Sequence, residues 1–457
     1  MVLFVCLHFS CLPAGSDGSN RQNEADTTQF SLDEVQRRTF NYFWTFTDDR
    51  HAQTLDRAPS RTFSSIAATG FGLTSYLVGV ERSLVTREAA AARTLQCLEA
   101  LYRLPQGPDS AGVAGYKGFF YHFLTLDKAL RFKDVELSTI DTGLLMAGVL
   151  SAQEYFDGDS DTERRIRQLA DRLYRRVEWD WAMQPDGLMS MGWRPERGFI
   201  EARWDGYNEA MILLVLALGS PTHPIADGSW EKWLEPYVWE TYYGQEHVNF
   251  SPLFGHQYSQ MYIDFRGLQD AYMREKGIDY FENSRRATLA NRAYCIDNPG
   301  QFTGYDSLTW GLTACDGPYS GLVAHAGDRL RVHSYWARGA SSIHVRDDGT
   351  LAPTAVGGSL PFAPEVCLPT LEHLWQTYYD DLIGPYGYRD AFNLTFNDLG
   401  QKGRWYDHDY LGIDQGPILI QIENHRSELI WNLMKQSPYI KMGLKRAGFV
   451  GGWLDEP

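Results

Sequence analysis

Three stretches of the chain are apolar around the whole circumference of a helix, and such helices must be enclosed by protein on every side. They follow Asp141, Glu209 and Asp414 and read TGLLMAGVL, AMILLVLAL and QGPILIQI. Helices of a second kind, each with one charged face, alternate with them and are predicted over residues 31–44, 86–101 and 161–177. The alternation predicts an inner ring of helices wrapped by an outer ring, which is an all-α toroid of the (α/α) type.

A solenoid of helix pairs is the competing all-α architecture, but no repeat of fixed length runs along the chain. No Pro-rich, Gly/Ser-rich or single-sign charged linker interrupts residues 26–457, so we expect a single domain there. Strand signals are sparse. The turn dipeptide Asp348-Gly349 lies between two short flanks and predicts one small β-hairpin over residues 345–354.

Residues 1–25 combine a short apolar stretch with small and polar residues, which is typical of an export leader, although a positive n-region is missing. We therefore expect an exported bacterial protein, periplasmic or secreted, with Cys6 or Cys11 as the modified residue if it is lipid-anchored. A disordered cytosolic tail is the alternative. No later run of about twenty uncharged apolar residues is present, so no membrane span is expected.

The net charge of −16 would repel a polyphosphate backbone, which excludes nucleic acid as an expected partner. Aromatic residues make up 14% of the chain and suit neutral ligands such as sugars, because they offer flat apolar faces beside polar edges. The cysteines beyond the leader form no CxxC pair and have no histidine at ligand spacing, so neither a zinc site nor a dense disulfide framework is expected. These four are Cys97, Cys295, Cys315 and Cys367.

Each of the three apolar helices carries a carboxylate in or just before its first turn, namely Asp141, Glu209 and Asp414. If the inner helices run parallel around a ring, their amino ends meet at one mouth and the three acids converge there. Glycosidic hydrolysis requires such a group, with one carboxyl protonated and one ionised. For each acid alone, helix capping is the competing explanation.

Polar and aromatic residues of the sugar-binding kind surround these acids in the sequence, and buried structural networks are the competing explanation for them. The candidate substrate-binding residues are Tyr207, Asn208, His256, Gln257, Arg266, Arg286, Trp310 and Gln415. Of the neighbours Arg285 and Arg286, one is expected to pair with a carboxylate internally and the other to lie near the site. No P-loop, GxGxxG, HExxH or GxSxG motif is present.

Six blocks of the sequence resemble one known family. They lie at residues 136–150, 207–225, 252–267, 280–294, 350–365 and 410–426, and include ELSTIDTGLLMAGVL, YNEAMILLVLALG and YLGIDQGPILIQIENHR. The chain is similar over residues 30–450 to the glycoamylase-like domain family, whose characterised bacterial members are endo-β-1,2-glucanases and sophorohydrolases of glycoside hydrolase family 144.

This resemblance implies an (α/α)6 toroid without a required metal, and hydrolysis of β-1,2-glucosidic bonds with inversion. We expect no cofactor and a monomer. The Glu of the YNEAM block is Glu209, which it implies as the general acid. For the base, Asp141 stands first and Asp414 second, while Glu136 is a third candidate and also a substrate-binding candidate. The stretch 48–72 matches only loosely the Gly-rich loop expected there, so endo or exo action stays open.

Two other functions compete with this one. The first is a hydrolase of the same fold that acts on another glucan, such as an α-glucan. The second is a non-catalytic sugar-binding protein whose acids are helix caps; a purely structural helical scaffold has less to support it.

Overall fold

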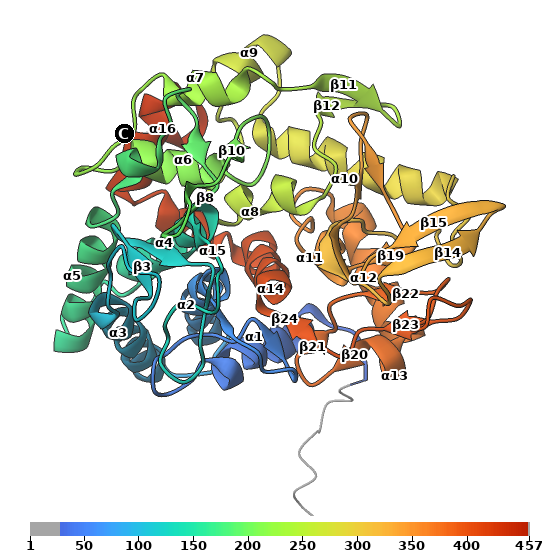
Figure 1. The fold of residues 1–457 in the computed structure, drawn as a ribbon, viewed down its shortest axis with the longest axis horizontal. Helices are drawn as coiled ribbons and strands as arrows, with labels where there is room; N and C mark the ends of the chain where they lie inside the picture. The colour runs from blue at the N-terminus through green and yellow to red at the C-terminus, as the bar shows by residue number, and fades with distance from the viewer. Residues whose placement is uncertain (1–27, 456–457) are drawn as a thin grey trace, which may run out of the picture.

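The structure is a computed structural model that describes residues 28–455, and helices dominate it (Figure 1). The predicted leader, with Cys6 and Cys11, lies outside the described residues. The helices are α1 (Leu32–Phe46), α2 (Ile66–Glu81), α3 (Arg87–Arg103), α4 (Thr139–Tyr155), α5 (Asp161–Arg175), α6 (Met211–Leu218), α7 (Ser229–Leu234), α8 (Phe254–Tyr262), α9 (Ala271–Lys276), α10 (Tyr280–Asp297), α11 (Pro353–Gly357), α12 (Pro364–Thr377), α13 (Tyr379–Leu382), α14 (Gly412–Ser427), α15 (Leu429–Met434) and α16 (Pro438–Arg446).

Six helices follow one another as neighbours around the middle of the molecule. α2 packs against α4, α4 against α6, α6 against α8, α8 and α11 against α14, and α14 returns to α2. A hydrogen bond from Gln257 of α8 to the Ala355 carbonyl of α11 links the remaining neighbours. Nearly every residue of α2, α4, α6 and α14 is buried, as the apolar circumference of the last three predicts.

A second set of helices covers these six from outside. α1 packs on α2 and α14, α3 on α2, α5 on α4, α16 on α6, α10 on α8 and α12 on α11. The predicted amphipathic helices over 31–44, 86–101 and 161–177 are α1, α3 and α5. Their amino ends are capped by Ser31, Thr86 and Ser160, whose side chains accept a hydrogen bond from the backbone N–H three residues on.

Short antiparallel strands are far more numerous than the sequence indicated. One sheet has five strands, β3 (Gly115–Tyr116), β4 (Phe119–Tyr121), β6 (Leu137–Ser138), β8 (Gly192–Arg194) and β9 (Gly198–Phe199), and another has β19 (Thr350–Leu351), β22 (Phe392–Asn393) and β23 (Trp405–Tyr406). The pairs are β1 (Arg57–Ala58) with β24 (Tyr410–Leu411), β2 (Ser64–Ser65) with β5 (Phe123–Leu124), β7 (Met189–Ser190) with β10 (Arg203–Trp204), β11 (Trp239–Tyr242) with β12 (Gln245–Val248), β13 (Ala314–Asp316) with β16 (Tyr335–Ala337), β14 (Gly321–His325) with β15 (Asp328–Val332), β17 (Gly339–Ala340) with β18 (Val345–Arg346), and β20 (Ile383–Gly384) with β21 (Gly387–Tyr388).

The hairpin predicted over residues 345–354 is wrong. Its two flanks are β18 and β19, but β18 pairs with β17 and β19 pairs with β22. The reason is Asp348, which is fully buried and holds the buried guanidinium of Arg338 at 2.6 Å, so the turn points into the core instead of closing a hairpin. Hairpins form elsewhere, and the longest is β14–β15.

Several of these strands lead directly into inner helices. β2 ends at Ser65 and α2 begins at Ile66, β6 runs into α4, and β24 runs into α14. Because β1 pairs with β24, and β2 with β5, the amino ends of α2 and α14 are held beside the same group of short strands. Among residues 28–455, no helix has the length and apolar character needed to cross a membrane. The four cysteines there are buried and unpaired.

Candidate active site

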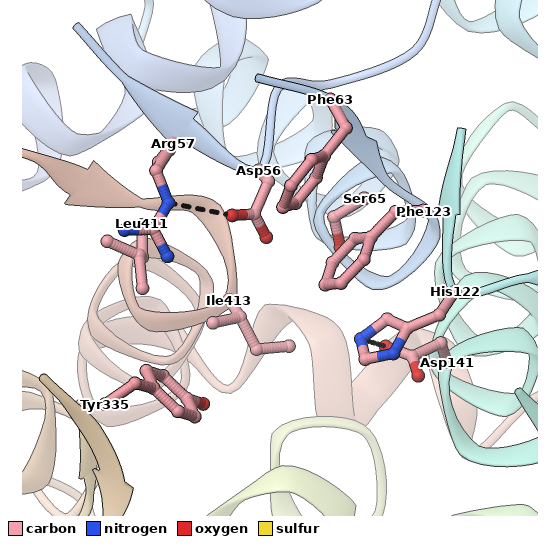
Figure 2. A pocket seen from close by; sticks show the side chains of 10 residues that line it. All are labelled: Asp56, Arg57, Phe63, Ser65, His122, Phe123, Asp141, Tyr335, Leu411 and Ile413. Atoms are coloured by element: carbon pink, nitrogen blue, oxygen red, sulfur yellow. Dashed lines mark hydrogen bonds and ion pairs between the residues drawn. The ribbon is translucent and has the colours of Figure 1, made fainter. Parts of the chain in front are cut away.

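A cavity of about 340 Å³ lies where the amino ends of α2, α4 and α14 meet (Figure 2). Ser65 caps α2, Asp141 lies in the first turn of α4, and Leu411 and Ile413 flank the start of α14. Its other lining residues are Asp56, Arg57, Phe63, His122, Phe123 and Tyr335. Of the three helices whose amino ends were predicted to meet at one mouth, α4 and α14 meet at this cavity, and the third helix there is α2, which was not predicted.

Asp141 is 6% exposed and is held by two groups on its carboxylate. Ser138, the residue that caps α4, donates its hydroxyl hydrogen to Asp141 Oδ2. His122 Nε2 lies 3.5 Å from Asp141 Oδ1, and the other ring nitrogen of His122 lies 3.1 Å from Glu136 Oε1. Asp141 is therefore both a capped helix residue and a cavity wall residue, so the capping and functional explanations apply together.

Glu136, directly before β6, is an ion-pair partner. Its carboxylate contacts His122 and, at 3.2 Å, Arg194 of β8. The hydrogen bond from His122 is the largest influence and, with Arg194, lowers the pKa of Glu136 to about 2. Glu136 is thus ionised over the whole working range of pH.

Glu209 lies two residues before α6 and is partly accessible to solvent. Its backbone is fixed, since its carbonyl oxygen accepts a hydrogen bond of 3.0 Å from Ser259 of α8. Burial raises the pKa of Glu209 to about 7, and the negative charge of Asp141 adds to the effect. A carboxyl with this pKa keeps its proton at near-neutral pH, as a general acid must.

Asp414, in the first turn of α14, is 3% exposed. Burial raises its pKa to about 7. Tyr258 of α8 is within the electrostatic influence of all three predicted acids: burial raises the pKa of its phenol well above the ordinary value, and the charges of Asp414, Glu209 and Asp141 raise it further. The structure therefore brings all three acids to one region.

Asp414 belongs to a buried group of four aspartates with Asp316, Asp390 and Asp407, which we call the aspartate cluster. Asp316, Asp390 and Asp407 offer carboxylate oxygens within 4.8 Å of one another, and the charge of Asp414 acts on Asp390, so the four groups titrate together rather than independently. Burial, followed by the neighbouring carboxylates, raises the pKa of Asp407 to about 8 and that of Asp390 well above its ordinary range.

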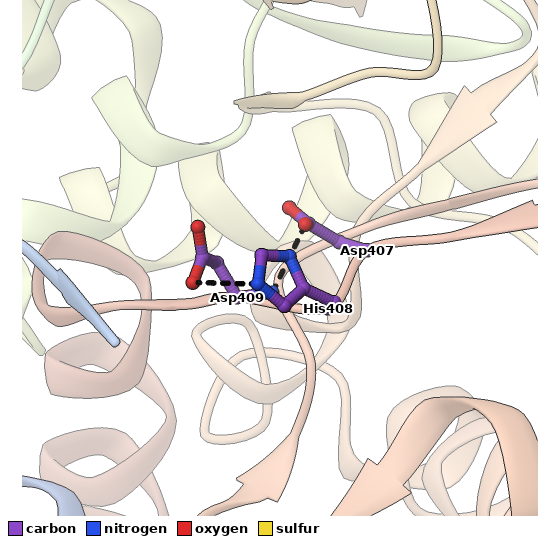
Figure 3. A group of neighbouring side chains, drawn as sticks. All are labelled: Asp407, His408 and Asp409. Atoms are coloured by element: carbon purple, nitrogen blue, oxygen red, sulfur yellow. Dashed lines mark hydrogen bonds and ion pairs between the residues drawn. The ribbon is translucent and has the colours of Figure 1, made fainter. Parts of the chain in front are cut away.

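Arg57 links the aspartate cluster to the cavity. Its guanidinium lies 2.6 Å from Asp316 and 3.2 Å from Asp56, and both Arg57 and Asp56 line the cavity. Within residues 28–455, carboxylate atoms come close enough for a shared cation, within 4.8 Å of one another, in two places. One is Asp316, Asp390 and Asp407, and the other is Asp407, His408 and Asp409, which follow one another along a single loop (Figure 3).

Of the candidate substrate-binding residues, those nearest Glu209 are buried parts of the framework. Asn208 caps the turn before α6, because its side-chain oxygen accepts the N–H of Ala210 at 2.9 Å. Tyr207 is buried and stacks on Tyr280 with ring centres 5.8 Å apart. His256 is 1% exposed, its Nε2 lies 3.1 Å from the Phe250 carbonyl, and burial lowers its pKa to about 3.

The remaining candidates do not line the cavity either, and each has partners elsewhere in the described chain. Gln257 binds α11, Trp310 donates to Thr370 at 2.8 Å, and Gln415 donates to the Tyr388 carbonyl at 2.8 Å. Arg266 pairs with Asp264 and Glu428 and covers Trp431. Arg285 and Arg286 pair with Glu365 and Glu282, so neither is the free site arginine that was expected.

The residues that do line the cavity were missed from the sequence, except for Asp141. Asp56, Arg57, Phe63 and Ser65 all come from the stretch 48–72, whose departure from the expected loop was the available signal. Nothing in the local sequence distinguished Tyr335, which is 53% exposed within the cavity wall.

Comparison with known proteins places this geometry in a family. The family model described as "Putative glucoamylase" matches residues 201–438. A curated exo β-1,2-glucooligosaccharide sophorohydrolase (non-reducing end) of Parabacteroides distasonis is 30% identical over 92% of this chain. The chain spans 58% of the length of that relative.

Several solved structures resemble this one over almost the whole chain. A crystal structure described as a "putative glucoamylase" from Bacteroides uniformis has a TM-score of 0.80 and 34% identity, covering 93% of this chain and 100% of its own. The endo-β-1,2-glucanase of Chitinophaga pinensis, solved with sophorotriose and glucose, has a TM-score of 0.79 and 27% identity, with 93% and 100% covered. Because the family model matches more than half of the chain, this protein belongs to the glycoamylase family.

Proposed function

We propose that the protein hydrolyses the β-1,2-glucosidic bonds of β-1,2-glucan with inversion, releasing sophorose or short sophoro-oligosaccharides. One observation carries the proposal: Glu209, a carboxyl with a pKa raised to about 7, lies within the electrostatic influence of Asp141, a carboxylate beside a cationic histidine. A proton-holding carboxyl next to an ionised one is the arrangement that glycosidic hydrolysis uses. The β-1,2 linkage is supported by the names of the Parabacteroides and Chitinophaga relatives.

In this mechanism Glu209 donates its proton to the glycosidic oxygen as the bond to the anomeric carbon breaks. A water molecule attacks that carbon from the opposite face, and the base takes its proton. Asp141 is the preferred base, because it lines the cavity and its carboxylate is held in place by His122 and by the hydroxyl of Ser138. Asp414 is the second candidate, since its raised pKa leaves it protonated for much of the time near neutral pH.

The fold proposed for this activity is an (α/α)6 toroid in one domain. Six inner helices, α2, α4, α6, α8, α11 and α14, are covered by α1, α3, α5, α16, α10 and α12. The protein is proposed to act as a monomer, without a metal or cofactor, after export to the periplasm or the outside of a bacterial cell. Tyr335, Phe63 and Phe123 on the cavity wall offer the aromatic faces that sugar rings stack on.

The test is product analysis of the purified protein with linear β-1,2-glucan, following the anomeric configuration by NMR, with starch in parallel. We expect α-anomeric sophoro-oligosaccharides from β-1,2-glucan and a rate at least about 10³-fold lower for Glu209→Gln. Turnover of starch but not of β-1,2-glucan would show that the substrate is an α-glucan and not β-1,2-glucan. Binding of β-1,2-glucan without turnover by the folded parent would instead support a sugar-binding protein.

A further inference from the structure

Among the described residues, His122 is the histidine that lines the cavity, where it lies beside Asp141 (Figure 2), and each of its two ring nitrogens faces a carboxylate. Nδ1 lies 3.1 Å from Glu136 Oε1 and Nε2 lies 3.5 Å from Asp141 Oδ1. A neutral imidazole can donate from only one nitrogen, whereas two flanking carboxylates both require a donor. The geometry therefore selects the doubly protonated imidazolium.

The ring of His122 has little freedom to turn. It lies between β4 and β5, its backbone N–H donates to the Glu136 carbonyl at 3.0 Å, and its own carbonyl accepts the N–H of Ile66 at 3.3 Å. The ring stacks on Phe123 with centres 3.9 Å apart and planes 22° from parallel. His122 is thus anchored both to the strand that leads into α4 and to the start of α2.

The charged groups around this ring come from four different elements. Glu136 and Asp141 contact it directly, and Arg194 of β8 holds the far side of Glu136. Asp56, next to β1, adds a third negative charge, which is itself paired with Arg57. Burial lowers the pKa of His122, but Asp141 and then Glu136 outweigh it and raise the pKa to about 9.

We infer that His122 is a positioning residue, whose imidazolium is held between Glu136 and Asp141 and in turn orients the Asp141 carboxylate on the cavity wall. The inference rests on the proposed function for its kinetic consequences. His122 acts on the reaction through Asp141, whose charge also raises the pKa of Glu209. Glu136 serves as the anchor of the histidine, which gives this carboxylate a role other than base or sugar ligand.

The kinetic test is His122→Gln, measured on β-1,2-glucan as kcat and KM across pH 4 to 9. Without the cation, the acidic limb of the kcat profile moves to higher pH, because the carboxylate base loses the positive charge beside it. At pH 6 we expect kcat to fall on the order of 10-fold to 100-fold and KM to change less than threefold. His51→Gln is the matched control, because His51 does not line the cavity and its ring contacts the Asp127 carbonyl. A uniform loss without any shift of the acidic limb would overturn the inference.

A second test does not depend on activity. The measurement is NMR of the parent with ¹⁵N-labelled histidine, and the ring signal that is missing from His122→Gln is assigned to His122. At pH 8 this signal should be that of an imidazolium. In Glu136→Gln the same ring should become neutral at pH 8, because it loses one of its two carboxylates. If the parent fails to cleave β-1,2-glucan but this ring is an imidazolium, the proposed function fails and the position of a cationic His122 between Glu136 and Asp141 is still supported. If the ring of His122 titrates with a pKa near 6.5 in the parent, the inference about His122 is overturned.

Discussion

Two groups of acids lie at the amino ends of the inner helices, and they handle charge in different ways. In the first, Glu136 and Asp141 flank a cationic histidine, and Glu209 stands beside them with a raised pKa. In the second, the aspartate cluster, four carboxyls face mainly one another and Arg57 is the cation in contact. In the first group one carboxyl, that of Glu209, holds a proton beside carboxylates that contact a cation. In the second group the carboxyls have similar surroundings and share protons with one another.

The difference shows that proximity of carboxyls does not by itself make a catalytic pair. A base must be ionised when the acid is protonated, and only an uneven environment produces that division. His122 and Arg194 place positive charge beside Asp141 and Glu136, and Glu209 has no such partner among the ion pairs of the described residues. In the aspartate cluster, burial acts on all members alike and raises their pKa values together.

The largest expected effect compares one member of each group. Asp141→Asn removes the proposed base, so kcat on β-1,2-glucan should fall by about 10²- to 10⁴-fold. Asp414→Asn replaces a carboxyl that is often protonated near pH 7 with a neutral isostere, so its kcat should stay within about tenfold of the parent. Steady-state kinetics at pH 6 measures both. A greater loss in Asp414→Asn than in Asp141→Asn would make Asp414 the base and reverse the comparison.

The next effect concerns stability. The pKa of Asp414 is about 7 in the folded state and about 4 in an unfolded chain, so the folded state binds the extra proton between these values. Stability therefore falls as pH rises from about 4 to 7. Asp414→Asn cannot lose that proton, and the slope of the unfolding free energy against pH should be less steep by up to about 1.4 kcal/mol per pH unit. Urea titrations at pH 5, 6 and 7 measure the slope.

The exposed Asp398→Asn is the matched control for that experiment, since Asp398 lies on the surface away from the cluster. Its slope should equal that of the parent. An Asp414→Asn slope that also equals the parent's would mean that the aspartate cluster is ionised in the folded protein, which contradicts proton sharing.

The smallest expected effect concerns Tyr335 on the cavity wall. Tyr335 lines the cavity and is 53% exposed, so Tyr335→Ala should raise KM about 3- to 10-fold with little change in kcat, because one aromatic contact with a sugar is lost. Tyr102, which is 40% exposed and lies on the outer helix α3, is the control, and Tyr102→Ala should leave KM unchanged. A fall in kcat with unchanged KM for Tyr335→Ala would assign the ring to the chemical step.

Much of the helical framework could be predicted from the sequence, because an apolar circumference and a capping serine are local signals. α1, α3, α5, α4, α6 and α14 all begin within two or three residues of the predicted starts. α2 was not predicted, since Gly70, Gly72 and Gly79 look like loop residues. In the structure a Cβ on Gly70 would lie 2.6 Å from the backbone of α4, so the glycine allows close packing of two helices.

The site was predictable only in part. The three acids follow from helix starts and do converge, but the side chains that give them different protonation states come from short strands whose pairing is non-local. His122 pairs through its backbone with Glu136, fourteen residues on, and Tyr335 reaches the cavity from β16. Conversely, His256, Gln257 and Trp310 are buried and bond to the Phe250 carbonyl, the Ala355 carbonyl and Thr370, and local sequence does not distinguish such core contacts from sugar ligands.

The central claim is that Glu209 is the proton donor, and the pH dependence of kcat/KM tests it most directly. Glu209 must be protonated in the free enzyme, so kcat/KM on β-1,2-glucan should fall as pH rises through about 7. On an aryl β-sophoroside with a good leaving group, which needs no proton donor, Glu209→Gln should remain active and show no fall near pH 7. A fall near pH 7 that persists in Glu209→Gln would contradict the account.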